Sequence, residues 1–369
     1  MWQTVKNIYD LGIKELRGLM GDWLMLLLII YSFTLAIYVT ANAYPDSLTN
    51  AAVAIVDEDN SQLTKRITDA LLPPYFMPPV NITQGEIDAG MDSGLYTFVL
   101  VFSVNFQKDV LSGNGPEIQM NVDATRMSQA FTGAGYIEQI ALDEIAKFTK
   151  GSSESMAKCV IRNRFNPNLT MSWFEGVMQL INNITMLAII LTGAALIKER
   201  ENGTLEHLLV MPVTEFEIIA SKIWSMGVAV LVSATFSVVV VIKGFMHVPI
   251  GGSLTLFVFG LALHLFAVTS MGIFLACVAH SMPQLGMLLI LVLIPMQMLS
   301  GGMTPRESMP EAIQLIMNLA PTTHFVQFSQ AILYRGAGFD VVWKPFLWLA
   351  GIGAFLFSSS LTQFRKSVA

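Results

Sequence analysis

The stretch Lys198-Glu199-Arg200-Glu201-Asn202-Gly203-Thr204-Leu205-Glu206-His207-Leu208-Leu209-Val210-Met211-Pro212 separates two apolar runs. Val177 to Ile197 and Ile223 to Ile242 are each close to the ~20 residues that a helix needs to cross a bilayer. Charged side chains are costly inside hydrocarbon, so the stretch between the runs must lie outside it. The sequence therefore predicts two membrane helices joined by a charged connection.

This connection carries local signals for a short helix of its own. Gly203 suits a left-handed residue after a helix C-terminus, and Thr204 is predicted to cap a new turn. Pro212 is predicted to end that turn, whose apolar face consists of Leu205, Leu208 and Leu209. Thr214, followed three residues later by Glu217, predicts a capping box at the start of the next span. We therefore expect a folded element here.

The composition is that of an integral membrane protein. Of 369 residues, 53% are hydrophobic and 13% are charged, and the mean hydropathy is positive. This balance excludes a soluble enzyme. We predict six transmembrane helices, at residues 23–43, 175–197, 223–242, 254–279, 285–303 and 343–363. The apolar core of the fifth is short for a span.

Lysine and arginine near the ends of the spans predict the orientation, because such residues accumulate on the cytoplasmic side. One side has eight of them: Lys6, Lys14, Arg17, Lys198, Arg200, Lys222, Arg365 and Lys366. The short segments on the other side have four: Lys243, Arg306, Arg335 and Lys344. We therefore place both termini, including the tail 364–369, and the connection 198–222 in the cytoplasm.

Residues 1–22 are predicted to form a cytoplasmic amphipathic helix along the inner membrane surface. Lys14, Arg17 and Trp23 are its candidate interfacial residues. An ordinary cytoplasmic helix without a membrane role is the alternative. Ala41-Asn42-Ala43 also fits a signal-peptidase site, but the apolar run before it is longer than the ~7 to 15 residues of a signal sequence.

The segment 44–174 has soluble character and is predicted to be an exported domain. It holds 9 Lys and Arg and 15 Asp and Glu, and 9 − 15 = −6, which equals the net charge of the whole chain. Strand patterns near Ala51 to Val56, Tyr96 to Phe102 and Ile118 to Val122 alternate with helical ones, which indicates a mixed α/β fold. The order of the strands cannot be read from the sequence.

That domain shows no catalytic residue set. It has no histidine, and its single Cys159 has no mate, since Cys277 falls in the fourth span. A disulfide framework is therefore excluded. Asp57-Glu58-Asp59 suits either a divalent cation or, more simply, a solvated turn after a strand. We expect no metal site.

Between the fifth and sixth spans, residues 304–338 predict two short amphipathic helices joined at Pro321. Such a pair between spans suggests re-entrant helices that lie on or dip into the outer leaflet. A surface pair that covers the bundle is the alternative.

The chain shows no energy source of its own. A phosphate-binding loop needs glycines and a Lys-Ser or Lys-Thr pair at fixed spacing, and Lys366-Ser367 lacks those glycines. Deep acidic residues of the kind that proton carriers use are missing from the predicted spans. We therefore expect no directly bound cofactor, with ATP and Mg²⁺ held by a partner ATPase. We expect no nucleic-acid partner.

The stretch Lys198 to Pro212 resembles the charged signature of the ABC type-2 transporter permeases. The likeness extends over essentially the whole chain to the YhhJ-like group of bacterial inner-membrane exporter permeases. The motifs that carry it are Thr125 to Ala130, Ser281 to Gln284, Met298 to Gly302, Thr304 to Pro310 and Ala331 to Gly338. The resemblance implies the six-helix ABC type-2 exporter fold with an inserted periplasmic α/β domain.

The resemblance also implies partners: an ABC ATPase, a second copy or paralogue of the permease, membrane lipid, and a HlyD-like periplasmic adaptor with an outer-membrane channel. The cargo would be an amphiphilic small molecule, drug or lipid. In the mechanism we expect, Leu205, Leu208 and Leu209 sit in a groove of the ATPase. The remaining residues of the coupling site would hold its rim and transmit motion: Glu199, Arg200, Glu201, Gly203, Thr204, Glu206 and Pro212.

A substrate path is predicted along the second and fifth spans, at Asn182, Asn183, Met296, Gln297 and Met298. Methionines there suit a deformable apolar wall; copper transport lacks the paired ligands it would need. Two other functions stay open: a membrane-anchored scaffold or receptor that recruits an adaptor, and an intramembrane enzyme. For the enzyme, His264 stands alone and is better explained as a buried hydrogen-bonding residue.

Overall fold

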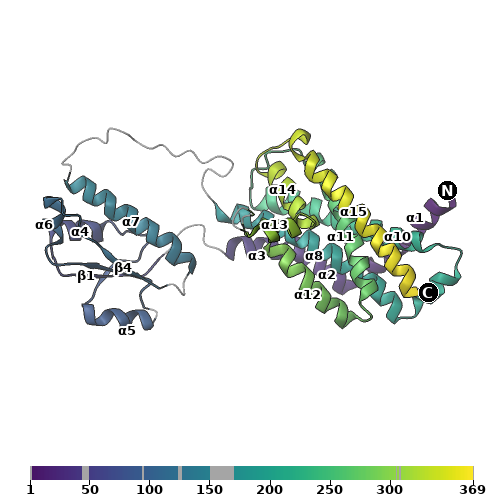
Figure 1. The fold of residues 1–369 in the computed structure, drawn as a ribbon, viewed down its shortest axis with the longest axis horizontal. Helices are drawn as coiled ribbons and strands as arrows, with labels where there is room; N and C mark the ends of the chain where they lie inside the picture. The colour runs from purple at the N-terminus through teal and green to yellow at the C-terminus, as the bar shows by residue number, and fades with distance from the viewer. Residues whose placement is uncertain are drawn as a thin grey trace. The chain divides into compact units, whose positions relative to one another are not determined.

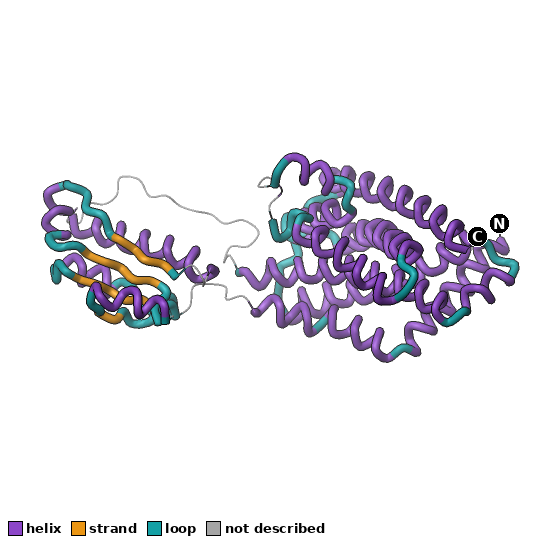
Figure 2. Tube along the Cα trace, turned by 60° about the horizontal axis from the view of Figure 1, so that its bottom comes forward, coloured by secondary structure: helices purple, strands orange, loops and turns teal. Residues whose placement is uncertain are grey.

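The computed structural model describes residues 2–43, 50–93, 95–123, 127–149, 170–304, 306 and 309–368. The chain divides into two units, Met1–Tyr44 with Asn163–Ala369 and Pro45–Arg162. The first consists of helices and their connections, and the second is built around a sheet (Figure 1; strands orange in Figure 2). Cys159 lies outside the described residues, as do Thr125 and Arg126 of the Thr125 to Ala130 motif and Pro305, Glu307 and Ser308.

Five helical segments of the described chain are long and apolar enough to cross a bilayer. They are α2 with α3 (Trp23–Phe33 and Leu35–Ala43), α8 (Met171–Glu201), α10 continued by the π-helical η2 (Glu215–Ser237 and Val238–Phe245), α11 (Leu254–Val278) and α15 (Phe339–Val368). The chain is therefore a polytopic helical membrane protein, as predicted. α8 and α11 are the most buried of the five.

The predicted fifth span is a shorter apolar helix, α12 (Met282–Met298). Its 17 residues reach roughly 25 Å at 1.5 Å per residue, which is less than the hydrocarbon thickness. Residues 299–303 do not continue the helix. Pro295 lies inside it and removes one backbone hydrogen bond near its end. Six spans therefore remain a prediction for this chain.

The first span is broken at Thr34, although neither proline nor glycine is nearby. The Thr34 hydroxyl donates to the Ile30 carbonyl one turn earlier, a bond of the kind that bends helices. A break also leaves backbone carbonyls without helical donors. Asn183 Nδ2 on α8 donates to one of these, the Ser32 oxygen, at 2.6 Å. The break is thus held from a neighbouring helix.

The predicted helix pair between α12 and α15 is present as α13 (Glu311–Met317) and α14 (Pro321–Leu333). α14 is a core element, since Phe325 and Phe328 are fully buried among α11 and α15. α13 is peripheral, with Leu315 and Ile316 more than 60% exposed. The two helices therefore differ: one packs inside the bundle and the other presents apolar side chains outward.

The second unit is a four-stranded mixed sheet in the order β2-β1-β3-β4. The strands are β1 (Val53–Asp57), β2 (Val80–Asn81), β3 (Phe98–Phe102) and β4 (Gln119–Val122). β1 pairs in parallel with β2 and β3, with Ile55 opposite Leu100, and β3 pairs antiparallel with β4. The mixed α/β domain between the first and second spans is confirmed.

Helices cover both faces of this sheet (Figure 1). On one face, Ile55 and Leu100 pack with α4 (Gln62–Asp69), α6 (Phe106–Ser112) and α7 (Met127–Thr149). On the other, Ala54 and Val99 pack with Ile87 and Met91 of the helix α5 (Ile87–Asp92), which follows the turn η1 (Gln84–Glu86). The covering of the second face, by residues after Pro79, was not predicted from the sequence.

The acidic run Asp57-Glu58-Asp59, at the end of β1, forms part of a hydrogen-bonded turn. Asp57 Oδ1 accepts from the backbone nitrogens of Asp59 and Asn60, at 3.2 and 2.8 Å, and Oδ2 accepts from the Thr64 hydroxyl at 2.8 Å. Ser61 caps α4 immediately afterwards. These bonds support the turn rather than the cation site, and the described residues contain no cluster of three metal-ligating side chains.

Candidate coupling site

The connection between α8 and α10 is folded as the local signals predict. α8 ends at Glu201, Gly203 has φ +68°, and α9 (Thr204–Val210) begins at once. The left-handed glycine and the Thr214–Glu217 capping box are both confirmed. One prediction is wrong: the N-cap of α9 is Gly203, and the Thr204 hydroxyl instead donates to the Glu199 carbonyl at 3.1 Å. Thr204 thereby ties α9 back to the end of α8.

Leu205 and Leu208 of α9 face the bundle, and the side chain of Leu209 lies outside the described residues. Leu205 and Leu208 are 6% and 8% exposed and belong to the permease's own apolar core, which differs from the expected seat in a partner's groove. Glu206 and His207 are exposed, and Val210 is 88% exposed. Pro212 follows the helix and is exposed too. The outward surface of the connection is thus formed by residues 206, 207 and 210–212.

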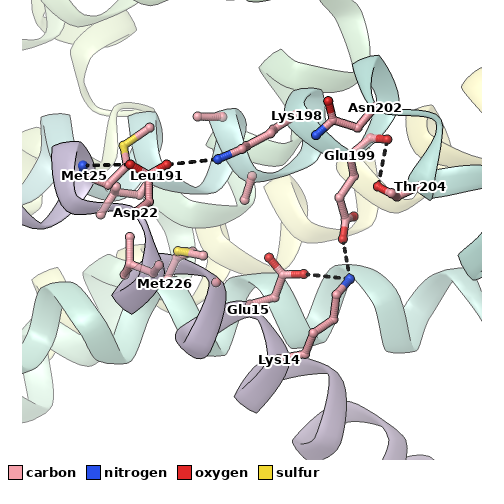
Figure 3. A pocket seen from close by; sticks show the side chains of 14 residues that line it. Lys14, Glu15, Asp22, Met25, Leu191, Lys198, Glu199, Asn202, Thr204 and Met226 are labelled. Carbon is pink, nitrogen blue, oxygen red and sulfur yellow. Dashed lines mark hydrogen bonds and ion pairs between the residues drawn. The ribbon is translucent and has the colours of Figure 1, made fainter.

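A buried charge cluster joins the end of α8 to α1 (Trp2–Gly21) and α10. Lys222 Nζ lies 2.7 Å from Glu199 Oε2 and 3.1 Å from Glu15 Oε1. Lys14 Nζ donates to Glu199 Oε1 at 2.8 Å and lies 3.7 Å from Glu15 (Figure 3). The four charges sum to zero, and each carboxylate meets both lysines. We call these four residues the charge cluster.

Burial sets the electrostatics of the charge cluster. Lys222 is 1% exposed, and the Glu15 and Glu199 side chains are 12% and 11% exposed. Burial, together with the neighbouring carboxylate of Glu199, raises the pKa of Glu15 above its ordinary value, although Lys222 and Lys14 oppose the rise. For Lys14, burial alone would lower the pKa, but Glu199 and Glu15 raise it above its ordinary value. Removing one member of such a buried set leaves a charge without compensation.

A second ion pair holds the start of the first span. Lys198 Nζ lies 2.9 Å from Asp22 Oδ2, and Asp22 Oδ1 caps α2 by accepting from the Met25 backbone nitrogen (Figure 3). The paired Lys198 and the backbone bond keep the pKa of Asp22 below its ordinary value. The same turn of α8 therefore contacts α1, α2 and α10.

The last turn of α8 also forms hydrogen bonds with the connection between α11 and α12. Arg200 Nη1 donates to the carbonyl oxygens of Ala276 and Ala279, at 3.3 and 2.7 Å. Glu201 Oε1 accepts from the Met282 backbone nitrogen, at 2.9 Å, in the first turn of α12. Arg200 and Glu201 thus link the connection to two further helices of the bundle.

α1 is fixed along α10 by polar and aromatic contacts. Trp224 Nε1 donates to the Ile8 carbonyl at 3.0 Å, and its ring stacks on Tyr9 with centroids 6.0 Å apart. Gly12 faces the same indole, and a Cβ atom there would come within 2.2 Å of it. Asn7 Nδ2 donates to Glu217 Oε2 at 3.3 Å. α1 is therefore docked on the bundle.

A cavity of about 260 Å³ lies among α1, α2, α8 and α10, beside the charge cluster. Its walls are apolar at residues such as Met25 and Leu191, and the charged residues that line it are of both signs: Lys14, Glu15, Asp22, Lys198 and Glu199 (Figure 3). Of the interfacial residues predicted from the sequence, Lys14 thus lines this site. Arg17 is exposed, and Trp23 is 68% exposed at the start of α2.

The structure does not bring the predicted path residues together as one surface. Asn183 is 3% exposed and bonded to Ser32 and Gln179, while Asn182 is half-buried. On α12, Met296 is 8% exposed, Gln297 is half-buried, and Met298 is 52% exposed. Their role in transport therefore remains a prediction.

His264 is structural, as its position in an apolar span without Asp, Glu, Lys or Arg suggests. It is fully buried, its Nε2 lies 3.0 Å from the Thr185 hydroxyl, and its ring stacks on Phe325 at 3.9 Å. Among the described residues it belongs to no group of three or more metal-ligating side chains. Cys277 is buried as a free thiol.

Glu15 was not predicted from the sequence as a site residue, and Lys222 was predicted only as a solvent-exposed lysine near the end of a span. A signal for Lys222 was present. It shares a helix face with Ile218, Ser225 and Met226, at spacings of three and four residues, and all of these are buried. A lysine inside such an apolar stripe indicates burial with a partner.

Gly203→Ala is expected to loosen the connection by about 1–2 kcal/mol, because an L side chain strains the left-handed backbone. Space is not the cause, since no heavy atom lies within 4 Å of a Cβ atom placed there. Gly203→Asn is expected to cost less, since asparagine tolerates this conformation. Hydrogen exchange of residues 204–210 measures the difference. Equal protection in the wild type and Gly203→Ala would contradict it.

These contacts define a helical membrane protein in which the connection between α8 and α10 is tied to helices α1, α2, α10, α11 and α12. The ABC-2 family transporter protein model matches residues 22–361. The chain therefore belongs to the ABC-2 family of transporter permeases.

The relatives agree along nearly the whole chain. The inner membrane transport permease YhhJ of Escherichia coli K12 is 58% identical over 367 residues, 99% of this chain and 98% of its own length. The probable multidrug ABC transporter permeases YbhR and YbhS of the same strain are 27% and 24% identical; they cover 98% and 91% of this chain and 99% and 89% of their own length. The chain is thus a multi-pass inner-membrane permease.

Proposed function

We propose that this chain is the permease subunit of an ATP-driven exporter, powered by a separate ABC ATPase that binds ATP and Mg²⁺. The observation that carries the proposal is the α9 connection: its outward surface is exposed, while its base is fixed to five helices of the bundle. An isolated permease has no use for a stiff, outward-facing element of this kind. A soluble partner that pushes on it would move several spans together.

The proposed topology has six spans, with α12 as the fifth, and both termini in the cytoplasm. The connection at Thr204 then lies on the cytoplasmic side, and the sheet unit is periplasmic. A cysteine introduced at Thr204, and another at Asp57, tests this with a membrane-impermeant thiol reagent, in a chain with Cys159 and Cys277 replaced by serine. Only the Asp57 position should react in spheroplasts before lysis; reaction of Thr204 there would overturn the topology.

The apolar surface of α12 supports pairing with a second permease, either a copy or a paralogue. Met287, Ile290, Leu291, Ile294 and Met298 recur at helical spacing, and each is at least 50% exposed. A periplasmic adaptor would dock on the sheet unit. The proposed cargo is an amphiphilic small molecule, drug or lipid, in keeping with the word multidrug in the names of YbhR and YbhS.

In the proposed mechanism the ATPase contacts Glu206, His207, Val210 and Met211 when its dimer closes. Leu205 and Leu208 anchor α9 to the bundle. Gly203, Thr204 and Glu199 pass the displacement into α8. Arg200 and Glu201 pass it to α11 and α12, and the charge cluster passes it to α1 and α10. Asn182, Gln297 and the methionines of α12 would then line the path that opens.

Replacing both Val210 and Met211 by glutamate is expected to weaken ATPase copurification by about tenfold or more, because burying an apolar side chain contributes roughly 1.5–3 kcal/mol. Both side chains are at least half exposed, so the permease should fold normally. Leu111→Glu, at a 59% exposed site in the sheet unit, is the matched control. Unchanged copurification and unchanged ATP-dependent efflux in the double variant would contradict the proposed contact between α9 and the ATPase.

A further inference from the structure

A second cavity lies at the end of α8 opposite the coupling site. It has a volume of about 580 Å³ and contains Phe174, in the first turn of α8. From there to Glu199 the helix rises by roughly 40 Å at 1.5 Å per residue. The other walls come from the turn after α12, from α13 and α14, and from the turn that follows α14. This cavity is therefore separate from the coupling contacts.

The described residues that line this cavity carry charge of one sign. Arg306 and Arg335 are the charged side chains among the described residues that line it, and no described carboxylate does so. Beside them lie the amides of Gln314, Gln327 and Gln330. Such a set offers many hydrogen-bond donors and a net positive charge, which suits a carboxylate or phosphate group.

Two observations show a cavity built for a ligand. Thr323, which lines it, is 1% exposed, and its Oγ1 has no hydrogen-bond partner among the described residues. A buried hydroxyl without a partner is costly. Arg306 is also held in place: its Nη2 donates to Asn318 Oδ1 at 2.5 Å, and its stem packs on Gly301, whose φ is +94°. An arginine has five donor hydrogens, so several remain for a ligand.

We propose that this cavity binds the phosphate of an anionic amphiphile, with Arg306 and Arg335 as the charged contacts and Thr323 as a neutral one. Arginine forks match the oxygens of a phosphate in pairs. Phe174 and Val326 supply apolar wall for the adjoining glycerol or acyl atoms. The site goes beyond export, because binding here requires neither an ATPase nor nucleotide.

The test uses the purified full-length permease in two arms. In nanodiscs of phosphatidylcholine with phosphatidylglycerol, native mass spectrometry counts retained phosphatidylglycerol. In a zwitterionic detergent, equilibrium dialysis measures inorganic phosphate. We expect about tenfold weaker binding in Arg335→Gln, from one lost charge-assisted hydrogen bond. Gln327→Glu, which places a carboxylate at the cavity, should lower binding similarly. Both sites are exposed, so folding should be retained.

Lys344→Gln is the matched control, because Lys344 is a cation of α15 that does not line this cavity. Retention in the first arm alone supports the site and assigns a lipid headgroup. Binding of inorganic phosphate as well supports it and assigns free phosphate as a second source. Equal binding in the wild type, Arg335→Gln and Gln327→Glu overturns the proposal, as does an equal loss in Lys344→Gln.

Discussion

Leu208→Pro is expected to abolish the stimulation of a partner's ATP hydrolysis while leaving the permease inserted in the membrane. α9 has seven residues, and Leu208 is the fifth. Proline there removes a helical hydrogen bond and clashes with the carbonyl one turn earlier, at a cost of about 3 kcal/mol. A helix of under two turns has little else to offset that cost. The outward surface of α9 would then lose its fixed position.

Stimulation is measured as ATP hydrolysis by the partner ATPase with and without permease in liposomes. Leu208→Met is the control, since it keeps the helix and nearly the volume of a side chain that is 8% exposed. Quantities of inserted permease should match in the two variants. Stimulation by Leu208→Pro equal to that of Leu208→Met would show that α9 transmits nothing.

The features of this site that the sequence predicted depend on neighbouring residues only. A left-handed glycine after a helix and a threonine three residues before a glutamate act within one turn of chain, as Gly203 and the Thr214–Glu217 box do. Spanning helices follow from length and hydropathy in the same way. The family signature is likewise a run of neighbouring residues, Lys198 to Pro212.

Whether the side chains of Leu205 and Leu208 on α9 face a partner or the permease itself could not be predicted in this way. A stripe of leucines on one side of a short helix fits a partner's groove and the helix's own bundle equally well. Packing of Leu205 and Leu208 against the ends of the spans decides the matter in the structure. Thr204 was misassigned for a related reason: its hydroxyl has a free acceptor in the preceding helix, the Glu199 carbonyl.

Long-range charge pairing was equally beyond the sequence. Lys222 and Glu15 are 207 positions apart, and Lys14 and Glu199 are 185 apart. Counting lysines and arginines near span ends treats each as a solvated charge, and this reading hides a lysine that is 1% exposed. In the sheet unit, β2 consists of only two residues after a proline pair. A strand this short shows no alternation of apolar and polar residues that could predict it.

Lys222→Met should have the largest effect on stability of any single change in the charge cluster. It leaves Glu15 and Glu199 facing each other with only the half-exposed Lys14 between them. Removing one partner from a buried ion pair costs about 3–5 kcal/mol. Lys14→Met, whose lysine is 53% exposed, should cost about 1 kcal/mol or less. Denaturant titration of the purified permease compares the two.

The loss in Lys222→Met should shrink as the pH falls. Burial already raises the pKa of Glu15, and removing Lys222 takes away the main attraction that opposes this rise. A carboxyl group whose pKa is higher in the folded state stabilises folding at low pH, and this contribution is lost as the pH rises through the folded pKa. Lys222→Met should therefore approach the wild type only as the pH falls to about 4, the unfolded value for glutamate.

The double variant Lys222→Met, Glu15→Gln separates this electrostatic cause from lost packing. With Glu15 neutral, Lys14 alone balances Glu199, so the uncompensated charge disappears while the methionine stays. We expect the double variant to recover most of the lost stability and to lose the extra pH dependence. If instead the two single effects simply add, the four residues do not act as one cluster, and α1 and α10 must be joined to α8 by packing around Gly12 and Trp224.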